Sequence, residues 1–182
     1  MLFRSVTALQ TSQGYLMFLS AALLGACLGF LPYNFRPGGA AQVFLGDGGA
    51  SFIGFTLAGL AVMGEWARDN PLIALFTPML ILGVPLFDIT FVAVNRVVVG
   101  KVHSVSEWLA YVGRDHIHHR FEALGLTKTE SVLLIFFISF TLGLSAVLLK
   151  DATPYEASLL LLQAIFILSI VAVLESVGRR GG

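Results

Sequence analysis

Five long apolar runs constrain the fold more than any other feature of this sequence. They cover residues 15–31, 51–66, 71–94, 131–149 and 155–177. About 20 helical residues cross the roughly 30 Å hydrocarbon core of a bilayer. Because a backbone polar group in lipid must be paired within its own segment, each run is expected to be a helix. The sequence therefore predicts an all-α, polytopic membrane helical bundle of about five transmembrane helices, forming a single membrane domain over residues 1–182.

Composition supports a membrane protein and argues against a nucleic-acid partner. Hydrophobic residues make up 57% of the chain and charged residues only 12%, against roughly 25% charged residues in a soluble domain. Such a chain cannot cover a water-soluble surface, so its main partner is the lipid bilayer. The 11 basic and 11 acidic residues give a formal net charge of zero, and no basic face for nucleic acid is indicated.

Local capping signals predict three helix starts independently of hydropathy. Asn70 precedes a proline, which is the pattern of an N-cap followed by a first helical residue that needs no N–H. Thr127 with Glu130, and Thr153 with Glu156, have the spacing of a capping box. Helices are therefore expected to begin close to these positions.

Basic residues indicate which side of the membrane each connection occupies. If the five runs alternate, segments 34–49 and 95–130 and the tail after residue 177 share one side. By the positive-inside rule this side is cytoplasmic and the amino terminus lies outside, an arrangement that would be natural if preceding helices were missing. Within segment 95–130, Ser104 and Glu107 predict a short interfacial helix. Eight basic residues lie on the cytoplasmic side and three on the other: Arg36, Arg96, Lys101, Arg114, Arg120, Lys128, Arg179 and Arg180, against Arg4, Arg68 and Lys150.

Asp47 is the first candidate for chemistry, because it stands among glycines in the sequence Phe-Leu-Gly-Asp-Gly-Gly before an apolar run. Glycines let backbone and carboxylate approach a ligand closely, and a helix start adds favourable potential for a phosphate. The structural alternative is that Asp47 caps the helix and the glycines form a turn.

The second candidate is a cluster that holds three of the four histidines: His116, His118 and His119, flanked by Arg114 and Arg120. Three histidines within one helical turn do not match the separated ligand pairs of zinc sites. Imidazoles and guanidinium groups on the cytoplasmic face instead offer donors to a phosphate or pyrophosphate. A surface role in touching lipid headgroups is the alternative.

Asp88 and Asn95 lie near the inner end of the third apolar run. An ionisable residue near membrane depth is a functional candidate by default. A role in helix packing or at the membrane interface is the equally weighted alternative, and the sequence leaves both open.

Three motifs in this order resemble the polyprenyl-phosphate N-acetylhexosamine-1-phosphate transferases. This family includes the phospho-N-acetylmuramoyl-pentapeptide transferases and the undecaprenyl-phosphate N-acetylglucosamine-1-phosphate transferases. The resemblance runs from about Gly25 to the end and indicates the C-terminal part of such an enzyme. The motifs are Leu-Gly-Phe-Leu-Pro-Tyr-Asn at 28–34, Phe-Leu-Gly-Asp-Gly-Gly at 44–49 and His-Ile-His-His-Arg-Phe at 116–121.

The resemblance implies transfer of a sugar 1-phosphate from a UDP-N-acetylhexosamine-type nucleotide to undecaprenyl or another polyprenyl phosphate, releasing UMP. It implies Mg²⁺, with Mn²⁺ as the alternative, and an active site facing the cytoplasm from the bacterial inner membrane. Peptidoglycan, teichoic acid and the O-antigen of lipopolysaccharide are the polymers begun in this way. The implied site assigns Asp47 to the metal, His118 and His119 to the diphosphate, His116 and Arg120 to assisting roles, and Asn34 and Phe44 to the uridine.

The chain departs from the family pattern in four respects. It has no adjacent aspartate pair and no asparagine- and aspartate-rich middle loop, it has about half the usual helices, and Ala50 replaces a serine. We expect a fragment rather than a genuine half-length protein, inactive alone if its site needs the absent half. Helix faces left open would favour pairing with a second copy or with the missing N-terminal half.

Two other functions remain open at this stage. A non-catalytic membrane binding or assembly protein would keep UDP-sugar or lipid-phosphate affinity without releasing UMP. A small transporter is motivated by Asp88 and the glycine-rich helices.

Overall fold

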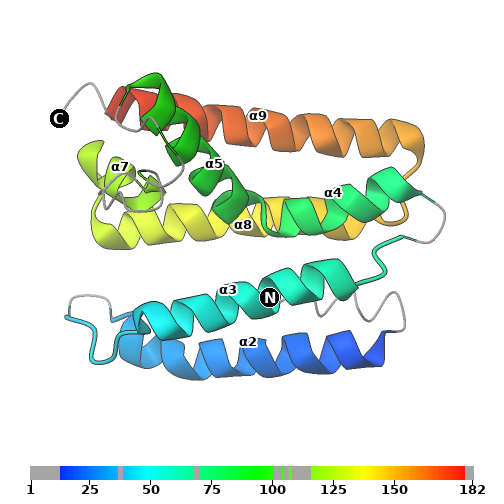
Figure 1. Cartoon of the computed structure of the whole chain (residues 1–182), viewed down its shortest axis with the longest axis horizontal. Helices are drawn as coiled ribbons and strands as arrows, with labels where there is room; N and C mark the ends of the chain where they lie inside the picture. The colour runs from blue at the N-terminus through cyan, green and yellow to red at the C-terminus, as the bar shows by residue number, and fades with distance from the viewer. Residues whose placement is uncertain are drawn as a thin grey trace. The chain divides into compact units, whose positions relative to one another are not determined.

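The computed structural model describes residues 13–36, 39–67, 70–100, 104, 107 and 116–178, and within these ranges the regular structure is entirely helical. Figure 1 shows the helices in chain order, and the all-α prediction is confirmed. They are α2 (Gly14–Asn34), α3 (Gly46–Met63), α4 (Pro71–Ile81), α5 (Gly83–Val98), α7 (Ile117–Ala123), α8 (Lys128–Leu149) and α9 (Pro154–Gly178).

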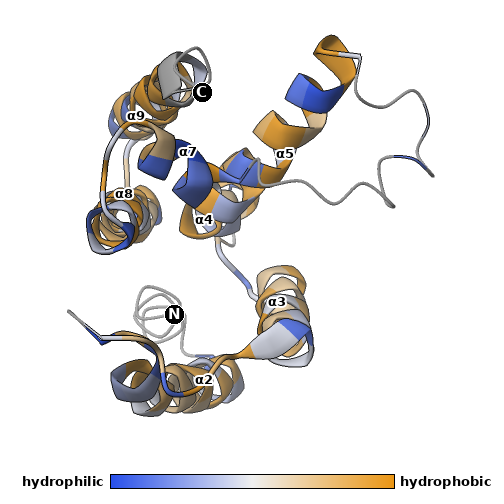
Figure 2. Cartoon of the chain, turned by 90° about the vertical axis from the view of Figure 1, so that its left-hand side faces the viewer, coloured by the Kyte–Doolittle hydropathy of each residue, from blue (hydrophilic) through white to orange (hydrophobic). Residues whose placement is uncertain are grey.

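Among the described residues, four helices are long and apolar enough to cross a membrane, or five if the bent pair α4 and α5 forms one span. The four are α2, α3, α8 and the first 21 residues of α9. No more than 28% of the apolar window in any of them is buried, so most of their apolar side chains face outward. Figure 2 shows these helices as predominantly hydrophobic. The chain is a multi-pass membrane protein, as its hydropathy predicted.

The predicted single helix over residues 71–94 is wrong in one respect, because the structure divides it at Leu82. The cause is Pro85, which has no N–H to donate to the carbonyl of Ile81 and whose ring would clash there. The proline falls instead in the first turn of α5, where backbone N–H groups have no helical partner in any case. α5 then continues to Val98, into the predicted loop 95–130.

Several other helix ends differ from the limits of the apolar runs. α2 continues to Asn34 and α3 begins at Gly46 rather than at residue 51, whereas α3 ends at Met63, short of residue 66. Hydropathy marks only the part of a helix that suits lipid, whereas the backbone hydrogen bonds continue into polar residues. The predicted loop 34–49 is shorter as a result.

All three predicted helix starts are confirmed by hydrogen bonds. The Asn70 side-chain oxygen accepts bonds from the N–H groups of residues 72 and 73, at 3.0 and 3.3 Å. Glu130 accepts from the Thr127 N–H at 2.7 Å, and Glu156 from the Thr153 N–H at 2.8 Å, completing two capping boxes. The Ser104 hydroxyl likewise accepts from the N–H of residue 107; the remainder of that predicted interfacial helix lies outside the described residues.

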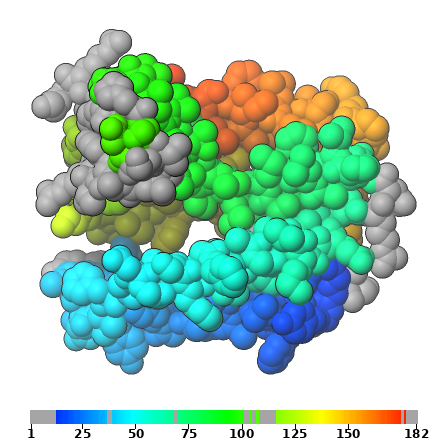
Figure 3. Space-filling model, in the orientation of Figure 1, coloured from blue at the N-terminus to red at the C-terminus, as the bar shows by residue number. Residues whose placement is uncertain are grey.

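The chain divides into two compact units. The first comprises residues 1–81 and 146–151, and the second comprises residues 82–145 and 152–182. In the first unit, α2 and α3 run antiparallel and side by side (Figures 1 and 3). Leu16 packs against Leu60, and the Gln13 amide both donates to the Glu65 carbonyl and accepts from its N–H. These contacts hold the start of α2 to the chain just after α3.

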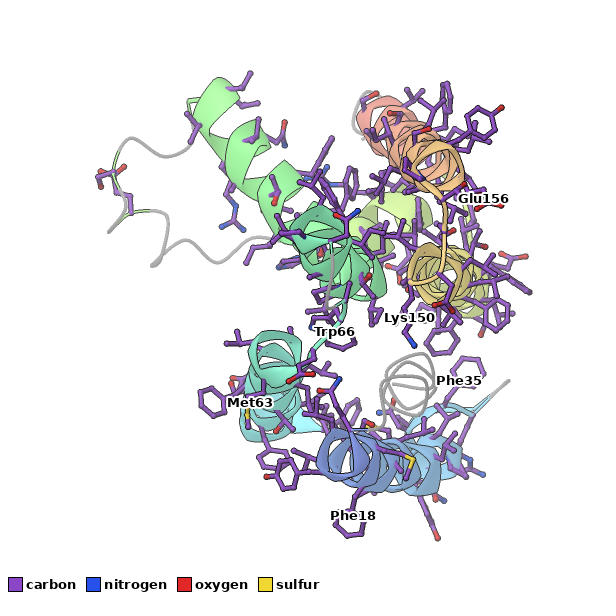
Figure 4. All side chains as sticks on the ribbon, turned by 90° about the vertical axis from the view of Figure 1, so that its right-hand side faces the viewer. Phe18, Phe35, Met63, Trp66, Lys150 and Glu156 are labelled. Atoms are coloured by element: carbon purple, nitrogen blue, oxygen red, sulfur yellow. The ribbon has the colours of Figure 1, made fainter. Side chains whose placement is uncertain are left out.

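Aromatic side chains of the first unit divide between its interior and its outer surface. Trp66 is buried and donates its indole N–H to the carbonyl of Ala61. Phe18 points away from α2 in Figure 4 and is 73% exposed. A phenyl ring this exposed on a membrane helix is suited to contact with lipid or with another helix rather than with water.

In the second unit, α9 contacts both α5 and the short helix α7. The end of α7 is fixed by Gly125, which adopts a φ of +94° that disfavours other residues. The N–H of Gly125 donates to the carbonyl of Glu122, and the N–H of Leu126 donates to that of Phe121. This pair of bonds is the Schellman arrangement, and it satisfies two carbonyls at the end of α7.

We predict that Gly83→Ala destabilises the protein and that Gly54→Ala does not. A Cβ at position 83 would lie 2.8 Å from a methyl carbon of Leu142, which is fully buried, so that one of the two must shift. Such overpacking costs about 1–3 kcal/mol. A Cβ at position 54 would meet nothing within 4 Å, and alanine should improve the helix there by up to about 1 kcal/mol. Thermal unfolding in detergent compares the two variants. Equal shifts in their unfolding temperatures would show that the contact with Leu142 is not tight.

Candidate active site

Asp47 lies in the first turn of α3 and is exposed. The cap position is occupied by Leu45, and no side chain caps the helix. Capping therefore does not explain Asp47, which was the alternative considered from the sequence. The preceding Gly46 has a φ of +67°, a conformation that glycine tolerates without a steric penalty. This backbone turn presents the carboxylate at the start of a membrane helix.

Asn34 and Phe44 lie at the same end of the first unit, on the connection between α2 and α3. The side-chain amide of Asn34 donates to the carbonyl of Val43 at 3.0 Å, and the N–H of Gln42 donates to the carbonyl of Tyr33 at 2.8 Å. These bonds tie the end of α2 to the residues just before Phe44, whose side chain is 79% exposed. The structure thus gathers Asn34, Phe44 and Asp47 around one loop.

The histidine cluster lies at the start of α7, a helix with two distinct faces. Ile117, Arg120 and Phe121 are buried, at the i, i+3 and i+4 spacing that places side chains on one side of a helix. His118 is exposed and His119 half-buried. Figure 2 shows α7 as markedly more hydrophilic than the membrane helices. The two histidines therefore face away from the surface that anchors the helix.

His118 and His119 line an open hollow of about 850 Å³ between α7 and the first turns of α8. Glu122 and Lys128 complete its polar side, and three apolar residues of α8 form the other side: Val132, Ile135 and Phe136. Two imidazoles and an ammonium group are thus held beside an apolar wall, where electrostatic interactions are stronger than in bulk water.

The three imidazoles form a row along the start of α7. The ring centroids of His118 and His119 are 4.0 Å apart, and the rings of His116 and His118 are parallel within 3° at 6.5 Å. Burial lowers the pKa of His118 below its usual value, and the neighbouring positive charge of His119 lowers it further, while Glu122 acts in the opposite direction. The neutral form of the His118 imidazole is therefore favoured more than in a free histidine.

Asp88 is joined to the histidine cluster, which the sequence did not predict. Its Oδ2 lies 2.9 Å from Nδ1 of His116, and its Oδ1 accepts the backbone N–H of Ile117 at 2.9 Å. The two segments are 28 residues apart in the chain. The one signal available in the sequence was an acidic residue near membrane depth, and this signal could not identify the partner.

Arg120 lies on the buried face of α7, away from the hollow. Its guanidinium carbon is 4.7 Å from the centroid of the Phe91 ring, and the residue is 8% exposed. This cation–π contact attaches α7 to α5. The structure brings His118 and His119 to the hollow and turns Arg120 inward, while Arg114 lies outside the described residues.

Within the described part of the chain, no three His, Cys, Asp or Glu side chains are grouped so that they could hold a metal ion. Asp47 belongs to the first compact unit and the histidines belong to the second.

Comparison with known proteins identifies the family. Residues 1–65 match the model of glycosyl transferase family 4. Over 168 residues the chain is 34% identical to the probable undecaprenyl-phosphate N-acetylglucosaminyl 1-phosphate transferase of Bacillus subtilis, which covers 92% of this chain and 44% of that protein. The chain belongs to the polyprenyl-phosphate sugar-1-phosphate transferase family. The resemblance seen in its three motifs is thereby confirmed.

Other members of the family match a similar share of the chain. The decaprenyl-phosphate N-acetylglucosaminephosphotransferase of Mycobacterium tuberculosis is 30% identical over 175 residues, or 90% of this chain and 40% of that protein. The phospho-N-acetylmuramoyl-pentapeptide-transferase of Moorella thermoacetica is 30% identical over 144 residues, or 79% of this chain and 40% of that protein. The chain thus spans less than half the length of these relatives. No solved structure matches it significantly.

We predict that the two neighbours of His118 shift its pKa in opposite directions. His119→Gln should raise the pKa of His118, because it removes a nearby positive charge. Glu122→Gln should lower it, because it removes the carboxylate that stabilises the imidazolium. NMR titration of the histidine ring carbons in detergent measures both shifts. Shifts of the same sign in the two variants would contradict the described arrangement of charges.

Proposed function

We propose that this chain carries the phosphate- and nucleotide-binding part of an enzyme that transfers a sugar 1-phosphate from a UDP-sugar to a polyprenyl phosphate. The observation that carries the proposal is the hollow beside α7, where His118, His119 and Lys128 converge. Its donor groups suit phosphate oxygens. The names of the relatives supply the polyprenyl phosphate and the N-acetylglucosamine phosphate, which the hollow alone does not specify, and the UDP form of the donor is what the family resemblance implies.

In the proposed reaction, a phosphate oxygen of the polyprenyl phosphate attacks the β-phosphorus of the UDP-sugar. The new bond joins the lipid phosphate to the sugar phosphate, and the bond between the β-phosphorus and the bridging oxygen breaks. That oxygen stays with the departing UMP. The transition state places negative charge on oxygens around the β-phosphorus, so donors fixed beside it lower the barrier.

His118 and His119 are suited to bind these phosphates. An imidazole whose pKa is lowered by burial and by a neighbouring cation is neutral before substrate binds. A diphosphate would reverse that balance by favouring the charged form. His118 would then gain a proton and donate a charge-assisted hydrogen bond. Lys128, at the start of α8, adds its ammonium group to the same hollow.

Asp47 fits the Mg²⁺ that the family resemblance implies, because its carboxylate is exposed and supplies the oxygen ligands that this ion prefers. Mg²⁺ usually binds to one or two carboxylates together with substrate phosphates. When bound, the ion would neutralise charge on the diphosphate. Asn34 and Phe44, on the same loop, are proposed to contact the uridine, with the exposed ring of Phe44 available for stacking.

The proposed orientation places both parts of the site on the cytoplasmic face of the bacterial inner membrane. Asp47 and the histidines lie in segments that share one side if the spans alternate, and that side carries eight of the 11 basic residues. A UDP-sugar is a cytoplasmic metabolite, so a site for it must open there.

The proposal is tested by release of UMP from the purified 182-residue chain in lipid nanodiscs, supplied with UDP-N-acetylglucosamine, undecaprenyl phosphate and Mg²⁺. Asp47→Asn should lower turnover by at least about 100-fold, because it removes the charge that holds the metal. His118→Ala and His119→Ala should lower it by about 10- to 100-fold. The matched control is Asp151→Asn, another exposed aspartate outside the proposed site, and it should retain full activity.

Two outcomes of this assay would contradict the proposal. Unchanged turnover in all three site variants would show that the site is wrongly assigned. Absence of UDP-N-acetylglucosamine binding would show that the chain does not carry the nucleotide-binding part, whereas binding without release of UMP fits both the non-catalytic binding protein and a fragment that needs its absent half.

We also predict that affinity for UDP-N-acetylglucosamine rises as pH falls from about 8 to about 6. The pKa of free His118 lies below its usual value, and a bound diphosphate raises it, so binding takes up a proton in this range. Both phosphates of the nucleotide sugar stay ionised throughout, so the dependence reports on the protein. Isothermal titration calorimetry at the two pH values measures it. His118→Gln should flatten the dependence, and a slope unaltered by this change would assign the proton to another group.

A further inference from the structure

The carboxylate of Asp88 connects α5 to the first turn of α7 at two points. Oδ1 accepts the backbone N–H of Ile117, and Oδ2 pairs with Nδ1 of His116, both at 2.9 Å. The Asp88 side chain is 16% exposed, whereas that of His116 is 48% exposed. The acid therefore lies mostly inside the protein, and the far side of the imidazole remains open to solvent.

The bond to Ile117 supplies a cap that α7 lacks from its own residues. The first N–H groups of a helix have no partner within it, and the cap residue His116 makes no side-chain capping bond. A helix of seven residues is unstable by itself. Asp88, which lies on α5, accepts a hydrogen bond from the N–H of Ile117 at the start of α7. Gly125 fixes the other end of α7.

The bond to His116 selects one orientation of the imidazole. A carboxylate only accepts hydrogen bonds, so Nδ1 must carry the proton that joins the pair. Nε2 is then the nitrogen that points away from Asp88, and it donates a bond when the ring is protonated. The ring of His116 is parallel to that of His118, so the carboxylate fixes the first member of the imidazole row.

We propose that Asp88 is a positioning residue of the phosphate site, holding the start of α7 and the ring of His116 so that Nε2 faces a bound diphosphate. The identity of the ligand rests on the proposed function, whereas the clamp itself rests on the two contacts of the carboxylate. Anchoring of α7 does not by itself require the charge of Asp88, because Ile117 and Phe121 are buried and Arg120 lies over Phe91.

Removal of the Asp88 charge should change anion affinity in opposite directions, depending on whether Asp88 acts by positioning His116 or only through its charge. Loss of a negative charge close to an anion site would strengthen anion binding if charge alone mattered. Loss of the oriented His116 would weaken it, by about tenfold for one hydrogen bond to a charged group. Asp88→Asn is the suitable variant, because asparagine is the same size and still offers an oxygen to the N–H of Ile117.

The experiment measures the affinity of inorganic pyrophosphate for the purified chain by calorimetry, together with the His116 tautomer by ¹⁵N NMR. In Asp88→Asn we expect about tenfold weaker binding and loss of the strict Nδ1-protonated form, with thermal unfolding unchanged. Asp88→Ala should weaken binding at least as much and should also lower the unfolding temperature, since the cap is lost. Asp151→Asn is the control and should alter none of these.

Tighter or unchanged pyrophosphate binding in Asp88→Asn would overturn the inference, and so would an unchanged His116 tautomer. Failure of the proposed function is seen separately, as absence of UDP-N-acetylglucosamine binding by the unaltered chain. Pyrophosphate affinity does not depend on turnover, so the positioning role is decided in either case.

Discussion

Backbone amides have no water to bond with inside a bilayer, and the rest of this structure depends on that constraint. Inside the hydrocarbon the constraint is met by regular helix. At helix ends it must be met by something else, and there the chain uses specific side chains: Asn70 for α4, the pair Thr127 and Glu130 for α8, and Asp88 for α7. In α7 the group that satisfies the backbone also touches a histidine, so one carboxylate serves both the helix and the candidate site.

The sequence predicted the parts of the fold that are governed by local rules. Apolar length revealed the spans, and threonine–glutamate spacing located two helix starts, because the first signal lies within one continuous run of residues and the second within one helical turn. The break at Leu82 was not predicted, although Pro85 indicated it. Hydropathy measures how apolar a residue is and does not show that proline lacks a backbone N–H. The contact between Asp88 and His116 could not be predicted at all, since it joins residues 28 positions apart and depends on how α5 and α7 pack.

The candidate site shows the same division. The motif around Asp47 and the histidine row were recognisable from residue types and order. The histidine motif, however, suggested one role for residues that are neighbours in the sequence. In a helix, successive side chains are rotated by about 100°, so neighbours point in different directions. His118 and His119 face the hollow, while Arg120 faces Phe91 and the interior. Lys128 was counted only for membrane sidedness, and the structure shows that it lines the hollow with the histidines.

The short connection between α7 and α8 has a mechanical consequence. Only residues 124–127 separate the two helices, and this stretch is occupied by the Gly125 turn at one end and the Thr127 capping box at the other. No slack is left between the imidazole row and a helix that spans the bilayer. A tilt of α8, such as a thinner or thicker membrane would impose, is transmitted to the histidines rather than absorbed by a linker. Lipid thickness would thereby become a physical variable of the candidate site.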